Sequence, residues 1–108
     1  MSPNFTAACL QLNSKRNITE NIPEITKLLD EATSIGADFI TLPECTGLLE
    51  PNKNALKEKA PTEEDHQVLA LVQEKATKAN SWILIGSLAI KLSDGKIANR
   101  SYLVGPDG

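Results

Sequence analysis

The side chains that could do chemistry in this chain are few, and the most informative of them is Glu44. It follows the apolar run 37–42, in the order Leu42-Pro43-Glu44. A short run with β-branched and aromatic residues that ends in proline is typical of a buried central strand. Ligands of open α/β sheets bind at the carboxyl ends of the strands. The sequence therefore predicts that Glu44 brings one carboxylate to a ligand-binding edge; the alternative is a solvated loop glutamate.

Two cysteines and one histidine are the other candidates for nucleophilic, acid–base or metal chemistry. Cys9 and Cys45 stand in no CxxC or Cys/His pattern, so we expect no metal site, no disulfide and no cofactor. Neighbouring side chains of an extended strand point to opposite faces, so Cys45 is expected to face away from Glu44. Both cysteines are predicted to be packing residues. His66 lies among acidic residues and is expected to be a solvated helix residue.

The composition predicts one small globular domain. The chain has 108 residues, 41% of them hydrophobic and 23% charged, with a net charge of −3 and no cluster of Lys and Arg. Neither nucleic acid nor an anionic membrane surface is expected as a partner. Residues 1–4 carry no basic side chain and the apolar stretch 5–10 is short, so we predict no signal peptide, no membrane span and a cytoplasmic location.

Hydrophobic patterns predict a strand and a helix in the first third of the chain. Residues 5–12 form the strand. Apolar residues then recur every three or four positions up to Gly36, as in a helix ended by a left-handed glycine. Asn17 and Asn21 each precede a glutamate by three residues and both fit a cap. Pro23 favours a start at Asn21, or a kink there.

The remaining elements are predicted as a loop, a second helix and a hairpin. Residues 45–60 show no clear period and indicate a loop over the sheet edge. Thr62 is placed to cap the second helix by accepting a hydrogen bond from the amide of Asp65. Residues 81–90 and 97–104 are predicted strands on either side of an Asp-Gly turn.

The resulting order β-α-β-α-β-β predicts an α/β fold with helices on one face of a mixed sheet and right-handed crossovers. Half of a doubly wound nucleotide-binding fold is an alternative with the same early pattern. That fold needs a glycine-rich turn after its first strand to bring backbone amides to phosphate. Residues 12–17 contain no glycine, which disfavours the alternative.

Several short motifs also stand in a characteristic order along the chain. They are Gly36-Ala37-Asp38, Leu42-Pro43-Glu44, Ile85-Gly86-Ser87-Leu88, Asn99-Arg100-Ser101-Tyr102 and Pro106-Asp107-Gly108. The ordered set resembles the N-terminal portion of the nitrilase superfamily of carbon-nitrogen hydrolases, over the whole chain. Residues 44–49 and 85–92 look most similar to the branch that contains deaminated glutathione amidase and omega-amidase.

The resemblance implies an αββα sandwich that hydrolyses a small non-peptide amide through a cysteine thioester, with a Glu-Lys-Cys triad. Of the triad only the glutamate matches here, at Glu44, as the general base. The resemblance places the lysine and the nucleophilic cysteine beyond Gly108. Residues 1–108 are then a partial domain that is inactive alone and self-associates through an uncovered sheet face. The alternatives are a noncatalytic half-domain acting by association and an unrelated small-ligand-binding α/β module.

Overall fold

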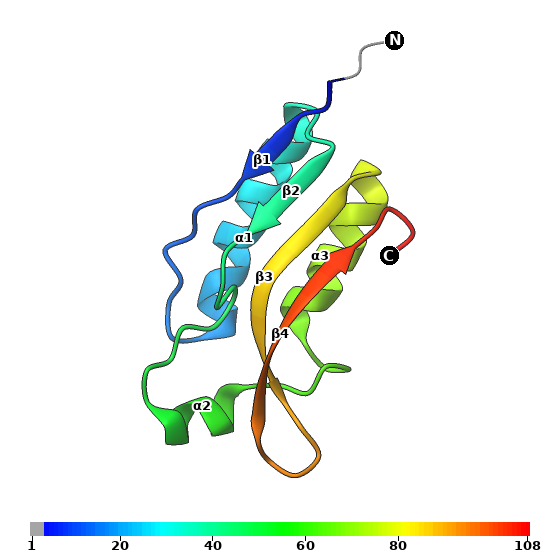
Figure 1. Ribbon diagram of the computed structural model, residues 1–108. Coiled ribbons are helices and arrows are strands. Elements are labelled where there is room, and N and C mark those ends of the chain that lie inside the picture. Colours follow the sequence, from blue (N-terminus) through cyan, green and yellow to red (C-terminus); the bar gives the residue numbers. More distant parts are fainter. Residues whose placement is uncertain (1–3) are drawn as a thin grey trace.

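The protein is described by a computed structural model over residues 4–108, which shows one four-stranded sheet with helices on one face (Figure 1). Residues 1–3 lie outside the described residues. They belong to the N-terminal segment in which the sequence predicts no signal peptide. The strands lie in the sheet in chain order. The first three are parallel, and the last pairs antiparallel with the third.

The order of elements confirms the predicted α/β fold, with one short helix added. Figure 1 shows α1 and α3 behind the sheet, and α2 beside the far end of the β3–β4 hairpin. No helix in residues 4–108 is both long and apolar enough to cross a membrane. The elements are β1 (Ala7–Cys9), α1 (Ile18–Ser34), β2 (Phe39–Leu42), α2 (Lys53–Lys59), α3 (Gln67–Ala79), β3 (Trp82–Lys91) and β4 (Ile97–Val104).

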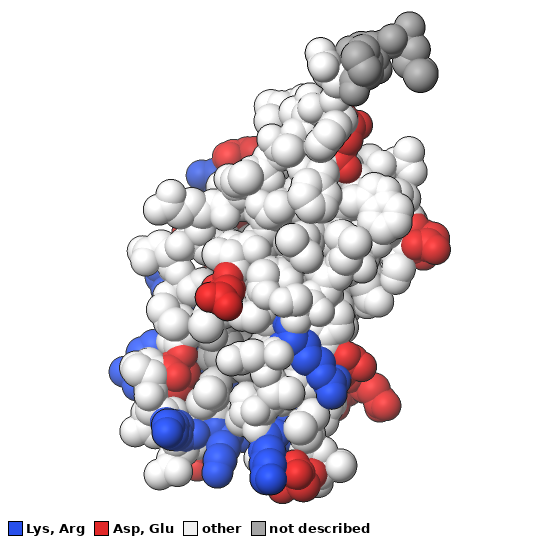
Figure 2. Space-filling model, in the orientation of Figure 1, with Lys and Arg blue, Asp and Glu red and all other residues white. Residues whose placement is uncertain are grey.

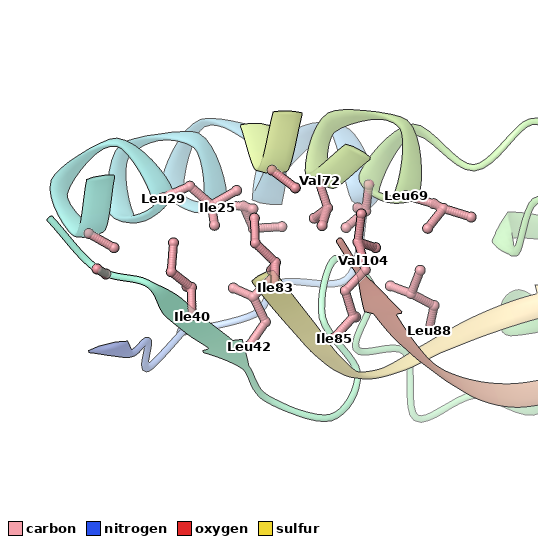
Figure 3. Packing of buried hydrophobic residues seen from close by; sticks show 14 of the residues in the cluster. Ile25, Leu29, Ile40, Leu42, Leu69, Val72, Ile83, Ile85, Leu88 and Val104 are labelled. Carbon is pink, nitrogen blue, oxygen red and sulfur yellow. The ribbon is translucent and has the colours of Figure 1, made fainter. Parts of the chain in front are cut away.

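The hydrophobic core lies between the two long helices and one face of the sheet (Figure 3). Ile25 and Leu29, one helical turn apart on α1, are fully buried, as is Val72 on α3. On the sheet side they face alternate residues of the strands, among them Ile83 and Ile85, which are also fully buried. Apolar residues that recur every 3.6 positions in the helices and every 2 positions in the strands thus pack together in one layer.

The other face of the sheet is not covered by any described helix. The side chains that lie on this face can be identified from strand alternation and register, because directly paired residues point to the same face. Trp82 is 50% exposed and Leu103 is 59% exposed. This open sheet face, seen largely white in the upper part of Figure 2, comprises Ala7, Cys9, Phe39, Thr41, Trp82, Leu84 and Leu103.

The start of α1 differs from the prediction, whereas its end agrees. The helix begins at Ile18, with Asn17 as the preceding cap residue, and it accommodates Pro23. The predicted start at Asn21 is wrong because that side chain bonds to neighbouring loops instead of capping the helix. Gly36 has a φ of +78°, as a left-handed terminating residue requires.

The predicted loop 45–60 contains α2, a helix of seven residues. Asn52 caps it, because its side-chain oxygen accepts a hydrogen bond from the Ala55 amide at 3.0 Å. A helix of two turns is too short to show a hydrophobic period, so the sequence pattern did not reveal it.

The second predicted helix begins later than expected. The Asp65 amide donates to the backbone carbonyl of Thr62 at 3.2 Å and closes a turn, so the predicted cap by the Thr62 side chain is wrong. Helix α3 starts at Gln67, after His66. His66 is only 2% exposed, contrary to the predicted solvated position.

The first strand is shorter than residues 5–12, and it leaves Cys9 exposed. β1 pairs only with the four-residue strand β2, so the ladder ends with the pair formed by Cys9 and Thr41. Cys9 lies on the open sheet face, where no described layer packs against it. The prediction that Cys9 is a buried packing residue is therefore wrong for this chain.

Candidate functional site

Glu44 lies in a turn that begins directly after β2, at the edge where the parallel strands end. β1, β2 and the first half of β3 run parallel and in register, so their carboxyl ends share this edge of the sheet. The Glu44 side chain is exposed. The predicted position is therefore observed, and the carboxylate is accessible to a molecule that approaches this edge.

Gly86 lets the chain carrying Glu44 pass close over β3. A Cβ atom at position 86 would lie 2.6 Å from the carbonyl carbon of Pro43 and 2.7 Å from the amide nitrogen of Glu44. Both contacts are with backbone atoms, which cannot move aside as a flexible side chain can. The position of Glu44 relative to β3 therefore depends on a glycine at 86.

The residues after Glu44 form a tight turn, not an extended continuation of the strand. Cys45 has a φ of +56°, in the left-handed region that side chains other than glycine rarely adopt. Its amide donates to the hydroxyl oxygen of Ser87 at 2.9 Å. The Thr46 amide donates to the Ser87 carbonyl at 3.1 Å. Strand alternation consequently says nothing about the direction of the half-buried Cys45, and that step of the prediction fails.

Asn21 ties the turn to α1 and to the loop after β1. Its side-chain amide donates to the carbonyls of Gly47 at 2.8 Å and Lys15 at 2.9 Å. Its side-chain oxygen accepts from the Lys15 amide at 2.7 Å. Asn21 is 3% exposed, and its bond to Gly47 is shielded from water. Sequence reasoning treated Asn21 as a helix cap and missed this role; the signal was a polar residue on the apolar side of the helix.

A cluster around Glu50 holds the far end of the same loop. The Glu50 carboxylate has no exposed surface and pairs with the Arg16 guanidinium at 2.7 Å and the Lys59 ammonium at 2.6 Å. It also accepts from the Asn52 amide at 3.0 Å. The hydrogen bonds from Arg16 and then Lys59 lower the pKa of Glu50 to about 2. The Glu50 cluster, defined as these four residues, was not predicted from the sequence.

His66 is the remaining sequence candidate. Burial lowers its pKa, and a hydrogen bond to the backbone of Ala89 opposes that shift in part. Its Nδ1 atom is buried and has no hydrogen-bond partner among the described residues. Within residues 4–108, no group of three or more His, Cys, Asp or Glu side chains could hold a metal ion. The arrangement around Glu44 is thus a single carboxylate on a firmly held turn.

A cavity lies elsewhere on the chain. Its volume is about 610 Å³, and it is lined by residues that include Trp82 at the start of β3, Leu69 of α3 and Asp107 near the C-terminus. Glu44 is not among its lining residues. The accessible carboxylate and this cavity are therefore separate features of the chain.

Comparisons with known proteins give relatives that match nearly all of this chain. It is 31% identical over 105 residues to nitrilase homolog 2 of Dictyostelium discoideum, covering 96% of this chain and 31% of that protein. It is 29% identical over 106 residues to a deaminated glutathione amidase of Synechocystis, covering 96% of this chain and 38% of that protein. The chain thus spans about a third of the length of the curated relatives it matches.

A solved structure agrees in fold. The NitFhit protein of C. elegans superimposes with a TM-score of 0.84 at 25% identity, over 95% of this chain and 25% of that one. The model of the carbon-nitrogen hydrolase family matches residues 6–108. The resemblance to the nitrilase superfamily is therefore confirmed, and the chain belongs to the family of carbon-nitrogen hydrolases.

Proposed function

We propose that these residues are the part of an amidase that supplies the general base, Glu44, for hydrolysis of a small non-peptide amide. The observation that carries the proposal is an exposed carboxylate at the carboxyl end of β2 in a chain that belongs to the carbon-nitrogen hydrolase family. The similarity to a deaminated glutathione amidase supports an amide as the substrate class. We place the protein in the cytoplasm and assign it no cofactor.

The proposed reaction converts an amide and water into a carboxylic acid and an amine. A cysteine sulfur adds to the amide carbonyl carbon while Glu44 takes the thiol proton, and the carbon-nitrogen bond then breaks as the proton passes to the leaving amine. Water next attacks the thioester carbon while Glu44 takes its proton, and the carbon-sulfur bond then breaks as Glu44 returns that proton to the sulfur. A lysine ammonium stabilises the negative oxygen formed in both steps.

We assign the lysine and the nucleophilic cysteine to sequence outside these 108 residues. The relatives are about three times as long as the matched region, which leaves room for both. Of the cysteines present, Cys9 lies exposed on β1, and Cys45 uses its backbone amide to hold the turn. Residues 1–108 are thus proposed to be a partial domain without amidase activity of its own.

The decisive test is Glu44→Gln in the complete enzyme, with deaminated glutathione and other small amides as substrates. Glutamine keeps the shape of the side chain but cannot accept the proton, so turnover should fall by about 100- to 10,000-fold. Glu58→Gln, at an exposed glutamate of α2, is the matched control and should keep the parent rate. Turnover by Glu44→Gln at the parent rate, in a protein with an unchanged circular dichroism spectrum, would refute the role of Glu44.

A noncatalytic half-domain that acts by association is the second candidate, and the open sheet face favours it. The two candidates differ in what the complete protein does, because only the first requires it to hydrolyse an amide. Family membership argues against the third, an unrelated ligand-binding module. Assays of residues 1–108 with and without the remaining chain separate the first two.

A further inference from the structure

Ser87 bonds both peptide groups that follow Glu44. Its hydroxyl oxygen accepts from the Cys45 amide at 2.9 Å, and its carbonyl oxygen accepts from the Thr46 amide at 3.1 Å. Ser87 is 7% exposed, so water competes little for these bonds. One residue of β3 therefore holds two successive amides of the turn that carries Glu44.

A bulge in β3 gives Ser87 this position. Ile85 pairs with Tyr102 and Leu88 pairs with Arg100, so two residues of β3 lie opposite the single residue Ser101. Such a bulge bends the strand and redirects a side chain, often beside an active site. Here it directs the Ser87 hydroxyl to the turn instead of leaving the residue in the regular ladder.

The bond to Ser87 falls at the most strained backbone position of the turn. Cys45 is one of two residues other than glycine with positive φ among residues 4–108. A conformation of this kind persists only where the surroundings impose it. The Ser87 hydroxyl is a direct hydrogen-bond partner of the Cys45 amide, so removing it frees the peptide group next to Glu44.

We propose that Ser87 is a positioning residue for Glu44, which holds the peptide between Glu44 and Cys45 so that the carboxylate keeps one direction at the sheet edge. The proposal rests on the proposed function of Glu44. Asn21 holds the far end of the same turn through the Gly47 carbonyl at 2.8 Å. The Thr46 amide stays bonded to the carbonyl of residue 87 in any variant, so loss of the Ser87 hydroxyl releases only the Cys45 amide, and with it the peptide that follows Glu44.

The first arm of the test measures the turn itself, in the 108-residue chain and without any substrate. Ser87→Ala should speed hydrogen exchange of the Cys45 amide by about tenfold, as expected for loss of one shielded hydrogen bond. Ser81→Ala is the matched control, because Ser81 is also buried and its hydroxyl donates to the Ala37 carbonyl at 2.7 Å, just before β3 begins. It should leave exchange at Cys45 unchanged.

The second arm measures catalysis in the complete enzyme. Ser87→Ala should lower kcat by about 10- to 100-fold with little change in KM, because a displaced base slows the chemistry more than binding. Ser87→Thr keeps the hydroxyl and should restore most of the rate. In a Glu44→Asp background, whose shorter side chain already misplaces the carboxylate, Ser87→Ala should cost less than in the parent enzyme.

The outcomes separate this proposal from the proposed function. Unchanged exchange at Cys45, or unchanged kcat in a folded Ser87→Ala enzyme, overturns the positioning role. Equal losses from Ser87→Ala in the parent and Glu44→Asp backgrounds also overturn it, since the two residues then act independently. If Glu44→Gln keeps the parent rate, the proposed function fails and the positioning role fails with it, even where exchange shows that Ser87 holds the turn.

Discussion

At the scale of single residues, the site depends on how closely two backbone segments approach. Gly86 lies under the Pro43–Glu44 peptide, and no side chain fits between them. A serine then follows and bonds the next two amides. The position of Glu44 therefore depends on residues that take no part in the reaction. Substitutions at residues 86 and 87 should displace the Glu44 carboxylate.

Gly86→Ala should destabilise the chain by about 1–3 kcal/mol, because the added methyl group overlaps backbone atoms that must move. Gly95→Ala is the control: it has a φ of +85° and no atom within 4 Å of the added carbon. Its cost is that of a left-handed alanine alone, about 1 kcal/mol. Urea unfolding followed by circular dichroism measures both. A smaller loss at position 86 than at position 95 would contradict the close contact.

Cys45→Ser should leave the complete enzyme active and still sensitive to a thiol-directed inhibitor. The reason is that Cys45 holds the turn through its backbone amide, which serine retains. We expect kcat within about twofold of the parent, since serine has the same shape as cysteine, is only slightly smaller and keeps the backbone amide. Loss of both turnover and inhibition in a folded protein would instead identify Cys45 as the nucleophile.

At the scale of elements, the Glu50 cluster links α2 to the loops that follow β1 and β2. Arg16 lies in the first loop, Glu50 in the second and Lys59 at the end of α2. Lys59 also donates to the Arg16 carbonyl at 2.8 Å. A helix with no buried residue is thereby attached through charges as well as through Leu56, which packs against the small cluster of Leu48, Ala60 and Ala89.

This attachment should make the stability contribution of Glu50 depend on pH. The pKa of Glu50 is lowered from 4.5 to about 2 in the folded chain, so the unfolded chain binds more protons between these values. The stabilisation is complete above pH 4.5 and is lost as the pH falls toward 2. Glu50→Gln should be less stable than the parent at neutral pH, and the difference should shrink toward pH 2.

Thermal unfolding of the parent and Glu50→Gln across this pH range tests the expectation. Glu58→Gln, exposed on the same helix, controls for the loss of one negative charge and should show a small difference that varies little with pH. A stability difference between parent and Glu50→Gln that stays constant from neutral pH to about 2 would show that the carboxylate is not what holds α2.

The elements that could be predicted from sequence are those with local signals. Gly36 ends α1 because a left-handed residue is needed there, and the Asp-Gly turn sets the β3–β4 hairpin. The start of α1 could not be predicted from local pattern alone. Asn21 matches a cap pattern, but its side chain forms hydrogen bonds with residues 6 and 26 positions away along the chain. Long-range partners of this kind leave no local pattern.

The site shows the same division between local and long-range signals. Glu44 was predicted because a strand followed by proline is a local pattern, and its position at the sheet edge is observed. Ser87 and Glu50 could not be assigned in advance, since their partners lie 42 and 34 residues away along the chain. His66 was misplaced because acidic neighbours in sequence said nothing about its burial against β3.

At the scale of the whole molecule, the helices cover one face of the sheet and leave the other open. Lys and Arg gather in Figure 2 at the lower end, while the upper part over the strands is largely uncharged. Large side chains such as Trp82 and Leu103 are half or more exposed there. Exposed apolar surface of this extent favours association, and we expect the 108-residue chain to self-associate through this face.

Leu103→Glu should shift the chain toward monomer, because it buries a charge in any contact made by the open sheet face. Ile35→Glu is the matched control, since Ile35 is 67% exposed but follows α1 and lies outside that face. Light scattering coupled to size exclusion, over a range of concentrations, gives the mass of each. A parent chain that stays monomeric and binds no apolar dye would contradict the expectation.

The bulge in β3 also limits how the length of this chain can vary. Removing one residue between Ile85 and Leu88 would restore a regular ladder and abolish the bulge that directs the Ser87 hydroxyl to the turn. The exposed turn 93–96 has no such constraint, because added residues there leave the paired strands in place. In an alignment of related sequences, gaps should therefore collect at the hairpin turn and be absent where β3 crosses beneath the turn that carries Glu44.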